Sequence, residues 1–441
     1  TKLKKHGNLA LIFNQPSEYE KIKADDRLSI KGLKTFAPGN PLVLHIVHSD
    51  GSEEEILLLK WLVARKNEGM SISRAIDLWR NQASQLPDQL HQSAGLQMEL
   101  RGSGDILEKL SKDWTQACLA FNEPAAELAV AKALAISSPM KVCTRVFQRG
   151  LAELGAGWYM GSVSVQQEHF ASALAARRLN ALFAIAPLPS RPGRLLAACP
   201  PGEEHDLALM MLSFMLRWQG WDVIYLGANV SLEKLDATLK ATRSRMIISA
   251  AQTLPAAASL VEMAKVANDL SVPLAFGGGI FNEIEGLPQQ IPGFYLGKEL
   301  DAAPPVIEML FKRCQPVAEI QPPPSSYSTA LQKFKENEAL IVSCTGQILR
   351  PIPISPSQLE LANTQFTQAM AAALALGNIH LLDYSAQWLN GLLENFGLSA
   401  KLATQYYKAF FQAVQDQIGI QAGPILEWLA GYKPVSSGEE G

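Results

Sequence analysis

The chain has 441 residues, of which 48% are hydrophobic and 18% charged, a balance that predicts a globular protein of two to four domains. The net charge of -3 excludes a polycation built to coat nucleic acid, and no apolar stretch is long enough to predict a transmembrane helix. Five cysteines without CxxC spacing argue against a disulfide framework, a zinc site or an iron–sulfur cluster, and favour a reducing, cytoplasmic location.

In the first part of the chain, the spacing of the apolar residues changes from a β-like to a helical pattern at about residue 57. Residues 1–57 are predicted to form a small β-rich piece, because short apolar runs alternate with turn signals such as Pro38-Gly39-Asn40-Pro41. From residue 55 the apolar spacing becomes helical, and helices with a break at Glu68-Gly69 are expected within residues 58–84. The chain begins without Met and without an apolar leader, so we interpret it as a fragment that lacks a signal peptide.

The remainder predicts a multidomain α/β protein. Residues 100–185 are expected to form a four-helix bundle with helices at 105–121, 124–136, 142–154 and 165–182. Residues 190–314 alternate strand and helix, which predicts a five-stranded parallel, flavodoxin-like sheet with strands at 195–199, 222–226, 246–250, 273–276 and 294–296. A proline-rich linker is expected at 315–328. A helical domain at 329–436 is expected to serve structure or oligomerisation.

A single histidine stands in the loop after the first predicted strand of this sheet. The sequence reads Cys199-Pro200-Pro201-Gly202-Glu203-Glu204-His205-Asp206 and then opens a helix. Ligands of doubly wound sheets bind at the carboxyl edge, where this loop is expected. His205 is therefore a candidate metal ligand, and Glu203 or Asp206 could orient its other ring nitrogen. For the histidine alone, an ordinary surface position near a helix start is the simpler interpretation.

Small residues end the neighbouring strands at the same edge. Gly227 ends the second strand, Ser249 lies at the end of the third, and Gly277, Gly278 and Gly279 end the fourth. A glycine triplet by itself usually marks a turn. Several small residues at one edge predict a deep slot that admits a large planar ligand or its tail.

These residues resemble the B12-binding domain shared by methionine synthase, corrinoid mutases and B12-dependent regulators. The family signature is Asp-x-His-x-x-Gly, followed by a Ser at the third strand's end and a Gly-Gly pair; this sequence has Glu203, His205, Ala208, Ser249 and Gly277-Gly278. Glu for Asp occurs in the regulator branch, whereas Ala208 departs from the signature. The resemblance implies that His205 binds the cobalt of cobalamin in place of the dimethylbenzimidazole base. The nucleotide tail would enter the slot lined by Ser249 and Gly277 to Gly279.

The predicted bundle carries a second group of candidate residues. Trp158 is expected in a turn after the third helix, and Glu168 and His169 follow a predicted capping box in the opening turns of the fourth. Alone, they fit a core aromatic residue and a solvated pair. A Trp followed after nine residues by Glu-His nevertheless resembles the CarH-like B12 photoreceptors of the MerR family. This implies that Trp158, Glu168 and His169 contact the adenosyl group of adenosylcobalamin. Tyr159 stands where those photoreceptors have a His that captures cobalt after photolysis.

The first 79 residues resemble parts of two different families. Residues 55–79 resemble the closing helices of a MerR-type DNA-binding domain, but the helix-turn-helix and wing that would read DNA are not found before them. Residues 1–57 resemble the C-terminal swivel domain of mitochondrial-type aconitase at 8–14, 24–34 and 37–42, without its cluster-binding cysteines. A working aconitase is therefore not expected. A truncated domain is joined to a truncated regulator, by natural fusion or by an error of sequence assembly.

The leading hypothesis is a non-enzymatic sensor or transcriptional regulator that binds adenosylcobalamin or another cobalamin. Light or ligand occupancy would change the packing of a homo-oligomer. DNA is a candidate partner, although the helices of the protein that would read DNA are not found. A membrane is not expected as a partner. The alternative is a corrinoid methyl-carrier component of a methyltransferase, and a third interpretation is an interaction protein whose cobalamin site has decayed. No Ser-His-Asp, P-loop or paired-carboxylate pattern suggests independent catalysis.

Overall fold

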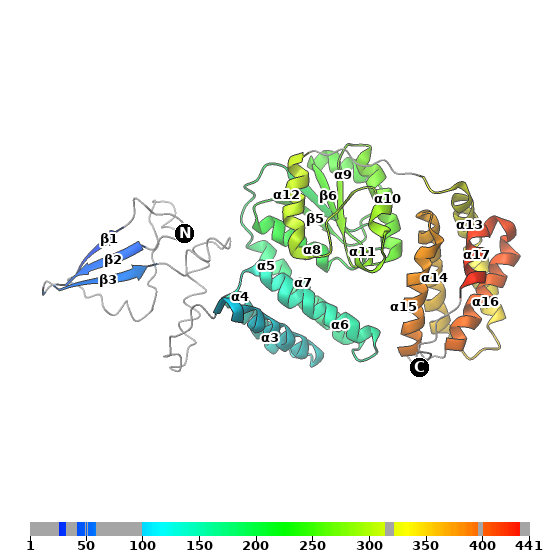
Figure 1. Cartoon of the computed structure of the whole chain (residues 1–441), viewed down its shortest axis with the longest axis horizontal. Coiled ribbons are helices and arrows are strands. Elements are labelled where there is room, and N and C mark those ends of the chain that lie inside the picture. Colours follow the sequence, from blue (N-terminus) through cyan, green and yellow to red (C-terminus); the bar gives the residue numbers. More distant parts are fainter. Residues whose placement is uncertain are drawn as a thin grey trace. The chain divides into compact units, whose positions relative to one another are not determined.

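The computed structural model describes residues 26–31, 42–48, 50, 52–58, 99–313, 322–395 and 400–432. The chain divides into two compact units, residues 1–117 with 122–150, and residues 118–121 with 151–441 (Figure 1). The MerR-like helices expected at 58–84 fall almost wholly outside the described residues, as do the aconitase-like segment 8–14 and residues 315–321 of the expected linker; the last residues of that linker, from Ser325, are helical.

An antiparallel sheet of three strands opens the first unit. Its order is β1 (Arg27–Lys31), β2 (Leu42–Val47) and β3 (Glu53–Leu58). The turn is closed by Asp50, whose Oδ1 accepts a hydrogen bond from the Ser52 amide at 2.9 Å. The β-rich start of the chain was predicted, but the helix expected from residue 55 was wrong for 55–58. The turn folds these residues back along β2, and pairing across the hairpin outweighs the helix preference of Glu and Leu.

Helices follow at 99–159, and their bounds differ from the expected ones. They are α3 (Glu99–Leu119), α4 (Glu123–Ile136), α5 (Pro139–Val142), the π-helix η4 (Cys143–Gln148) and α6 (Arg149–Tyr159). The side chain of Asn122 caps α4 by accepting from the Ala125 amide at 3.1 Å. In the core of the first unit, Trp114 and Phe147 meet edge to face, with ring centroids 5.7 Å apart. The third helix was expected to end at 154, but the chain stays helical to Tyr159.

The second unit contains a parallel sheet of five strands, as the sequence predicted. The α7 helix (Val165–Ala184) leads into it, with a capping box formed by Ser164 and Gln167. The elements that follow are β4 (Arg194–Ala198), α8 (Leu207–Trp218), β5 (Asp222–Gly227), α9 (Leu235–Thr242), β6 (Met246–Ala250), α10 (Leu254–Asn268), β7 (Leu274–Gly277), α11 (Ile280–Glu283), β8 (Phe294–Tyr295) and α12 (Ala303–Arg313).

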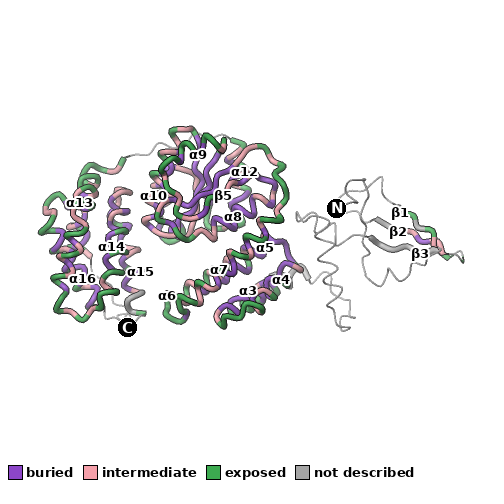
Figure 2. Tube along the Cα trace, turned by 180° about the vertical axis from the view of Figure 1, so that it is seen from behind, coloured by how far each residue is buried: buried purple, intermediate pink, exposed green. Residues whose placement is uncertain are grey.

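Both faces of this sheet are covered. Leu195 and Ala197 of β4 pack with α8 and α12, whereas Leu196 and Ala198 pack on the side of α9 and α10. The central strands β4 and β6 are therefore mostly apolar, and all their residues except Arg194 are buried; Figure 2 shows the buried interior of this part of the chain in purple. The strand order is β5-β4-β6-β7-β8, so successive strands are added on one side of β4 and then on the other, and the order of connection reverses at β4. A doubly wound sheet binds its ligand at this switch point, outside the carboxyl ends of the strands.

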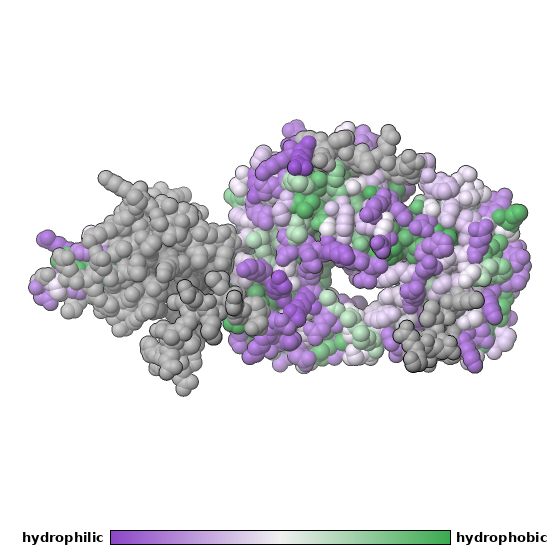
Figure 3. All heavy atoms as spheres, in the orientation of Figure 1, coloured by the Kyte–Doolittle hydropathy of each residue, from purple (hydrophilic) through white to green (hydrophobic). Residues whose placement is uncertain are grey.

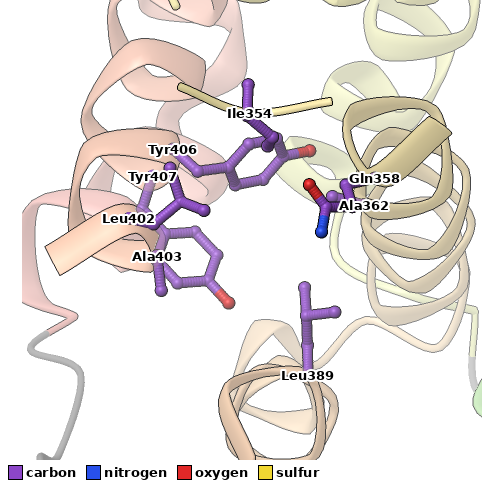
Figure 4. A pocket seen from close by; sticks show the side chains of 8 residues that line it. All are labelled: Ile354, Gln358, Ala362, Leu389, Leu402, Ala403, Tyr406 and Tyr407. Atoms are coloured by element: carbon purple, nitrogen blue, oxygen red, sulfur yellow. The ribbon is translucent and has the colours of Figure 1, made fainter. Parts of the chain in front are cut away.

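The C-terminal part of the second unit is helical, as predicted. It consists of α13 (Ser325–Ile348), α14 (Pro356–Ala375), α15 (Leu382–Asn395), α16 (Ala400–Gln417) and α17 (Gly423–Gly431), with short 3-10 turns between them. Its buried rings, among them Phe334, Phe366 and Phe410, belong to the same apolar cluster as one face of the parallel sheet. A small pocket lies between α14, α15 and α16, lined by Tyr406, Tyr407 and Leu389 together with Gln358 and apolar side chains (Figure 4).

The surface of the described residues mixes polar and apolar side chains. Figure 3 shows hydrophilic residues interspersed among apolar ones on the face that it draws. Across the described ranges, no helix is both long and apolar enough to cross a lipid bilayer.

Candidate functional site

The loop between β4 and α8 presents His205 at the carboxyl edge of the sheet. Gly202 turns the chain there with a φ of +83°, a conformation that favours glycine. Its amide donates to Oδ1 of Asn229 at 2.9 Å, which ties the loop to the segment after β5. The His205 side chain remains 70% exposed. An imidazole at the switch point is therefore accessible to a ligand.

A buried carboxylate sets the orientation of this imidazole. Glu203 is fully buried, and its Oε1 accepts hydrogen bonds from the His205 amide at 2.9 Å and from His205 Nδ1 at 2.8 Å. Because an ionised carboxylate only accepts hydrogen bonds, Nδ1 carries the proton of the neutral ring and Nε2 keeps its lone pair. The hydrogen bond that Glu203 accepts from the ring raises the pKa of His205, and burial opposes this in part. Nε2 of the neutral ring is thus the atom available to a metal.

Asp206, the other residue that could have oriented His205, has a different partner. Its Oδ2 accepts a hydrogen bond from the Tyr225 hydroxyl at 2.6 Å. Burial raises the pKa of Tyr225, and this hydrogen bond to Asp206 raises it further. Asp206 therefore ties the start of α8 to β5. Of the two candidates, the structure assigns the orienting role to Glu203.

Gln252, which the sequence interpretation missed, joins this loop to the glycine loop after β7. Its amide donates to Oε2 of Glu203, and its side-chain Oε1 accepts from the Gly279 amide at 2.8 Å. The residue lies just beyond the end of β6, next to the switch point. That position is its only signal in the sequence, because a polar residue after a strand belongs to no recognisable motif.

The predicted slot residues have distinct structural tasks. Ser249 is buried, and its hydroxyl donates to the Ala198 carbonyl at 2.6 Å, so it links β6 to β4. Gly278 has a φ of +123°, and a Cβ there would lie 1.9 Å from the Ala251 carbonyl oxygen. A Cβ on Gly277 would meet no atom within 4 Å. Gly278 is therefore required by close backbone packing, whereas Gly277 borders open space.

The upper group of candidate residues lies at the end of α6 and the start of α7. Trp158 is in the last turn of α6, so its expected position in a turn after the helix was wrong, because the helix continues to Tyr159. Glu168 accepts from His169 Nδ1 at 2.7 Å and from the Ser172 hydroxyl at 2.6 Å. The charge of Glu168 also contributes to the raised pKa of His205. The structure therefore brings Glu168 and His205 into the same electrostatic environment.

The donor set fits a metal that arrives with its own ligands. Within the described part of the chain, no three His, Cys, Asp or Glu side chains converge to hold a bare ion. One exposed imidazole, oriented by a buried carboxylate, is sufficient for a metal that a macrocycle already holds. The open space beside Gly277 fits the approach of such a group to the strand ends.

Two family models match this part of the chain. Residues 193–302 match a B12 binding domain, and residues 110–182 match a second model of the same description. Both the parallel sheet and the helices before it therefore resemble corrinoid-binding proteins. The cofactor indicated is a corrinoid.

Similar proteins agree with the resemblances seen in the sequence. The HTH-type transcriptional repressor CarH of Myxococcus xanthus is 30% identical over 198 residues, which are 44% of this chain and 62% of the repressor. A probable mitochondrial aconitate hydratase of Dictyostelium discoideum is 54% identical over 57 residues, 13% of this chain and 7% of that enzyme. The chain thus spans less than two thirds of either relative. The resemblances to CarH-like regulators and to aconitase are confirmed. Among solved structures, the Methanosarcina barkeri monomethylamine corrinoid protein is 16% identical, with a TM-score of 0.40, covering 46% of this chain and 98% of that one.

Proposed function

We propose that the chain is an adenosylcobalamin-binding sensor of the CarH type, with His205 as the lower cobalt ligand. The observation that carries the proposal is the hydrogen bond from His205 Nδ1 to buried Glu203, which leaves the lone pair of Nε2 available in a side chain that is exposed at the switch point of the sheet. Regulation of transcription through DNA, as the name of the repressor relative indicates for that protein, and assembly into a homo-oligomer belong to the same proposal.

Each group of residues has a defined task in this proposal. When bound, cobalamin supplies a cobalt–carbon bond that is weak enough for light to break. Glu203 holds the imidazole that replaces the cofactor's own base, and the slot at Gly277 admits the displaced nucleotide tail. Trp158 shields the upper ligand with an aromatic face, while Glu168 and His169 offer hydrogen-bonding groups to its sugar and base. Ser172 fixes one oxygen of Glu168 for this purpose.

The lower ligand is tested by the absorption spectrum of the full chain loaded with cobalamin in the dark. Wild type is expected to show histidine bound to cobalt, whereas His205→Ala shows the base-off spectrum and binds at least about tenfold more weakly, about 1.4 kcal/mol. His380→Ala, which removes another exposed histidine, is the matched control and leaves the spectrum unchanged. Identical spectra for wild type and His205→Ala would refute His205 as the ligand.

The preference of the chain for one upper ligand of cobalamin distinguishes a sensor from a methyl carrier. We expect tighter binding of adenosylcobalamin than of methylcobalamin, and a spectral change with a shift in oligomeric mass after green illumination of the adenosyl form. A preference for methylcobalamin, without a response to light, would favour a corrinoid methyl carrier instead. Failure to retain any corrinoid would contradict both functions and indicate a decayed site.

A further inference from the structure

The end of α6, which carries Trp158, is held by the C-terminal helical domain. The Tyr159 hydroxyl donates to the backbone carbonyl of Trp388 in α15 at 3.2 Å, and Nδ2 of Asn395 donates to the Tyr159 carbonyl at 3.0 Å. The Trp388 ring lies 5.7 Å from that of Tyr159 and 6.4 Å from that of Trp158, between ring centroids. These separations are typical of aromatic pairs that attract one another.

The contact between Tyr159 and α15 requires a residue without a side chain at position 391. A Cβ on Gly391 would lie 2.1 Å from the Tyr159 hydroxyl oxygen and 3.2 Å from the ring carbon that bears it. Glycine at 391 therefore lets the tyrosine lie against the helix backbone. Because the hydroxyl is much the nearest atom, the fit depends mainly on that oxygen.

The opposite side of α15 is anchored in the C-terminal domain. Ala386 and Leu389 are buried there, and Leu389 points into the pocket that Tyr406 and Tyr407 line (Figure 4). Nδ2 of Asn390 donates to the Tyr432 hydroxyl at 3.0 Å. A displacement of the α6 end would therefore be passed to the C-terminal helices through α15.

We propose that Trp388 is a positioning residue for the upper ligand of the cobalamin site, supplied by the C-terminal helical domain. It acts through Trp158 and not by touching the cofactor. The inference rests on the function proposed above. Its consequence is that the size of the upper ligand and the docking of α15 are coupled, and such coupling is reciprocal: docking favours one upper ligand, and that ligand favours docking.

Binding titrations of the full chain with adenosylcobalamin and hydroxocobalamin test this coupling. Hydroxocobalamin carries a small upper ligand and reports on the lower side alone. Trp388→Ala is expected to weaken adenosylcobalamin about tenfold and to leave hydroxocobalamin within about twofold of wild type. Trp388→Phe, which keeps an aromatic face, is expected to retain most of the preference for adenosylcobalamin over hydroxocobalamin. Gln387→Ala, at the exposed neighbouring position, is the matched control and changes neither affinity.

A pair of variants at Gly391 tests the same contact without altering an aromatic ring of the upper group. Gly391→Ala is expected to lower the preference for adenosylcobalamin, because its new methyl group collides with the Tyr159 hydroxyl. Tyr159→Phe in the Gly391→Ala background removes that oxygen and is expected to restore part of the preference. Hydrogen exchange over 384–395 is expected to be slower with adenosylcobalamin than with hydroxocobalamin in wild type, and equal in Trp388→Ala.

The outcomes distinguish the two proposals. Equal losses of both cobalamins in Trp388→Ala, or no loss of either, would overturn the role of Trp388 while leaving the cobalamin site intact. A wild-type chain that binds neither cobalamin would overturn the proposed function and the inference together. Circular dichroism of each variant shows whether the helices are retained. If Trp388→Ala does not fold, the Gly391 pair decides the matter.

Discussion

Replacement of Gly278 by alanine is expected to lower the free energy of unfolding of the second unit by about 3 kcal/mol or more. Two causes of this destabilisation add to each other. The residue has a φ of +123°, which a side chain strains, and its Cβ would lie 1.9 Å from the backbone oxygen of Ala251. Backbone cannot move aside as the end of a flexible side chain can. Denaturant titration followed by circular dichroism measures the change.

Gly277→Ala is the matched control for this prediction. Its Cβ meets nothing within 4 Å, so the unfolding free energy should stay within about 1 kcal/mol of wild type. The methyl group instead enters the open space offered to the nucleotide tail, and cobalamin affinity should fall about tenfold. Full cobalamin affinity in Gly277→Ala would mean that the tail does not pass this position. A Gly278→Ala chain as stable as wild type would contradict the packing argument.

Glu203→Gln is expected to weaken cobalamin binding by about 10- to 100-fold, the usual effect of losing the partner that orients a metal-bound histidine. The amide has nearly the shape of the carboxylate, but one of its two polar atoms is a donor. In the structure all three groups that face Glu203 are N–H donors: the His205 amide, His205 Nδ1 and the Gln252 amide. The side-chain NH2 of a glutamine at position 203 must therefore face one of these N–H donors in a buried place, where neither can find an acceptor.

Glu204→Gln provides the comparison for that measurement. Glu204 is exposed and accepts a hydrogen bond from Nδ2 of Asn229 at 2.7 Å, so on the same loop it has Asn229 and not the imidazole as its hydrogen-bond partner. We expect its cobalamin affinity, measured by spectral titration, to match wild type. If Glu203→Gln bound as tightly as Glu204→Gln, the orientation of His205 would not depend on the buried carboxylate.

Much of the α/β fold could be predicted because its signals are local. The strands β4 and β6 are mostly apolar, and their spacing by helices leaves few topologies for a parallel sheet. The loop with Glu203 and His205 was also recognisable, since its position after the first strand places it at the binding edge.

What could not be predicted depends on contacts between distant residues. β3 has the composition of a helix and becomes a strand only because β2 is there to pair with it. The helix that carries Trp158 is preceded by a π-helical turn at Cys143–Gln148, for which the sequence has no signal. Gln252 and Trp388 acquire their positions from tertiary packing, and nothing in their sequence neighbourhoods marks them as parts of a site.

The bridge formed by Gln252 has a consequence for how a cofactor would enter. One residue fastens the histidine loop through Glu203 and the glycine loop through Gly279. The protein therefore builds both halves of the lower site during folding, and little ordering of these two loops remains to oppose association. A cofactor that entered here would meet two loops that are already fastened to each other.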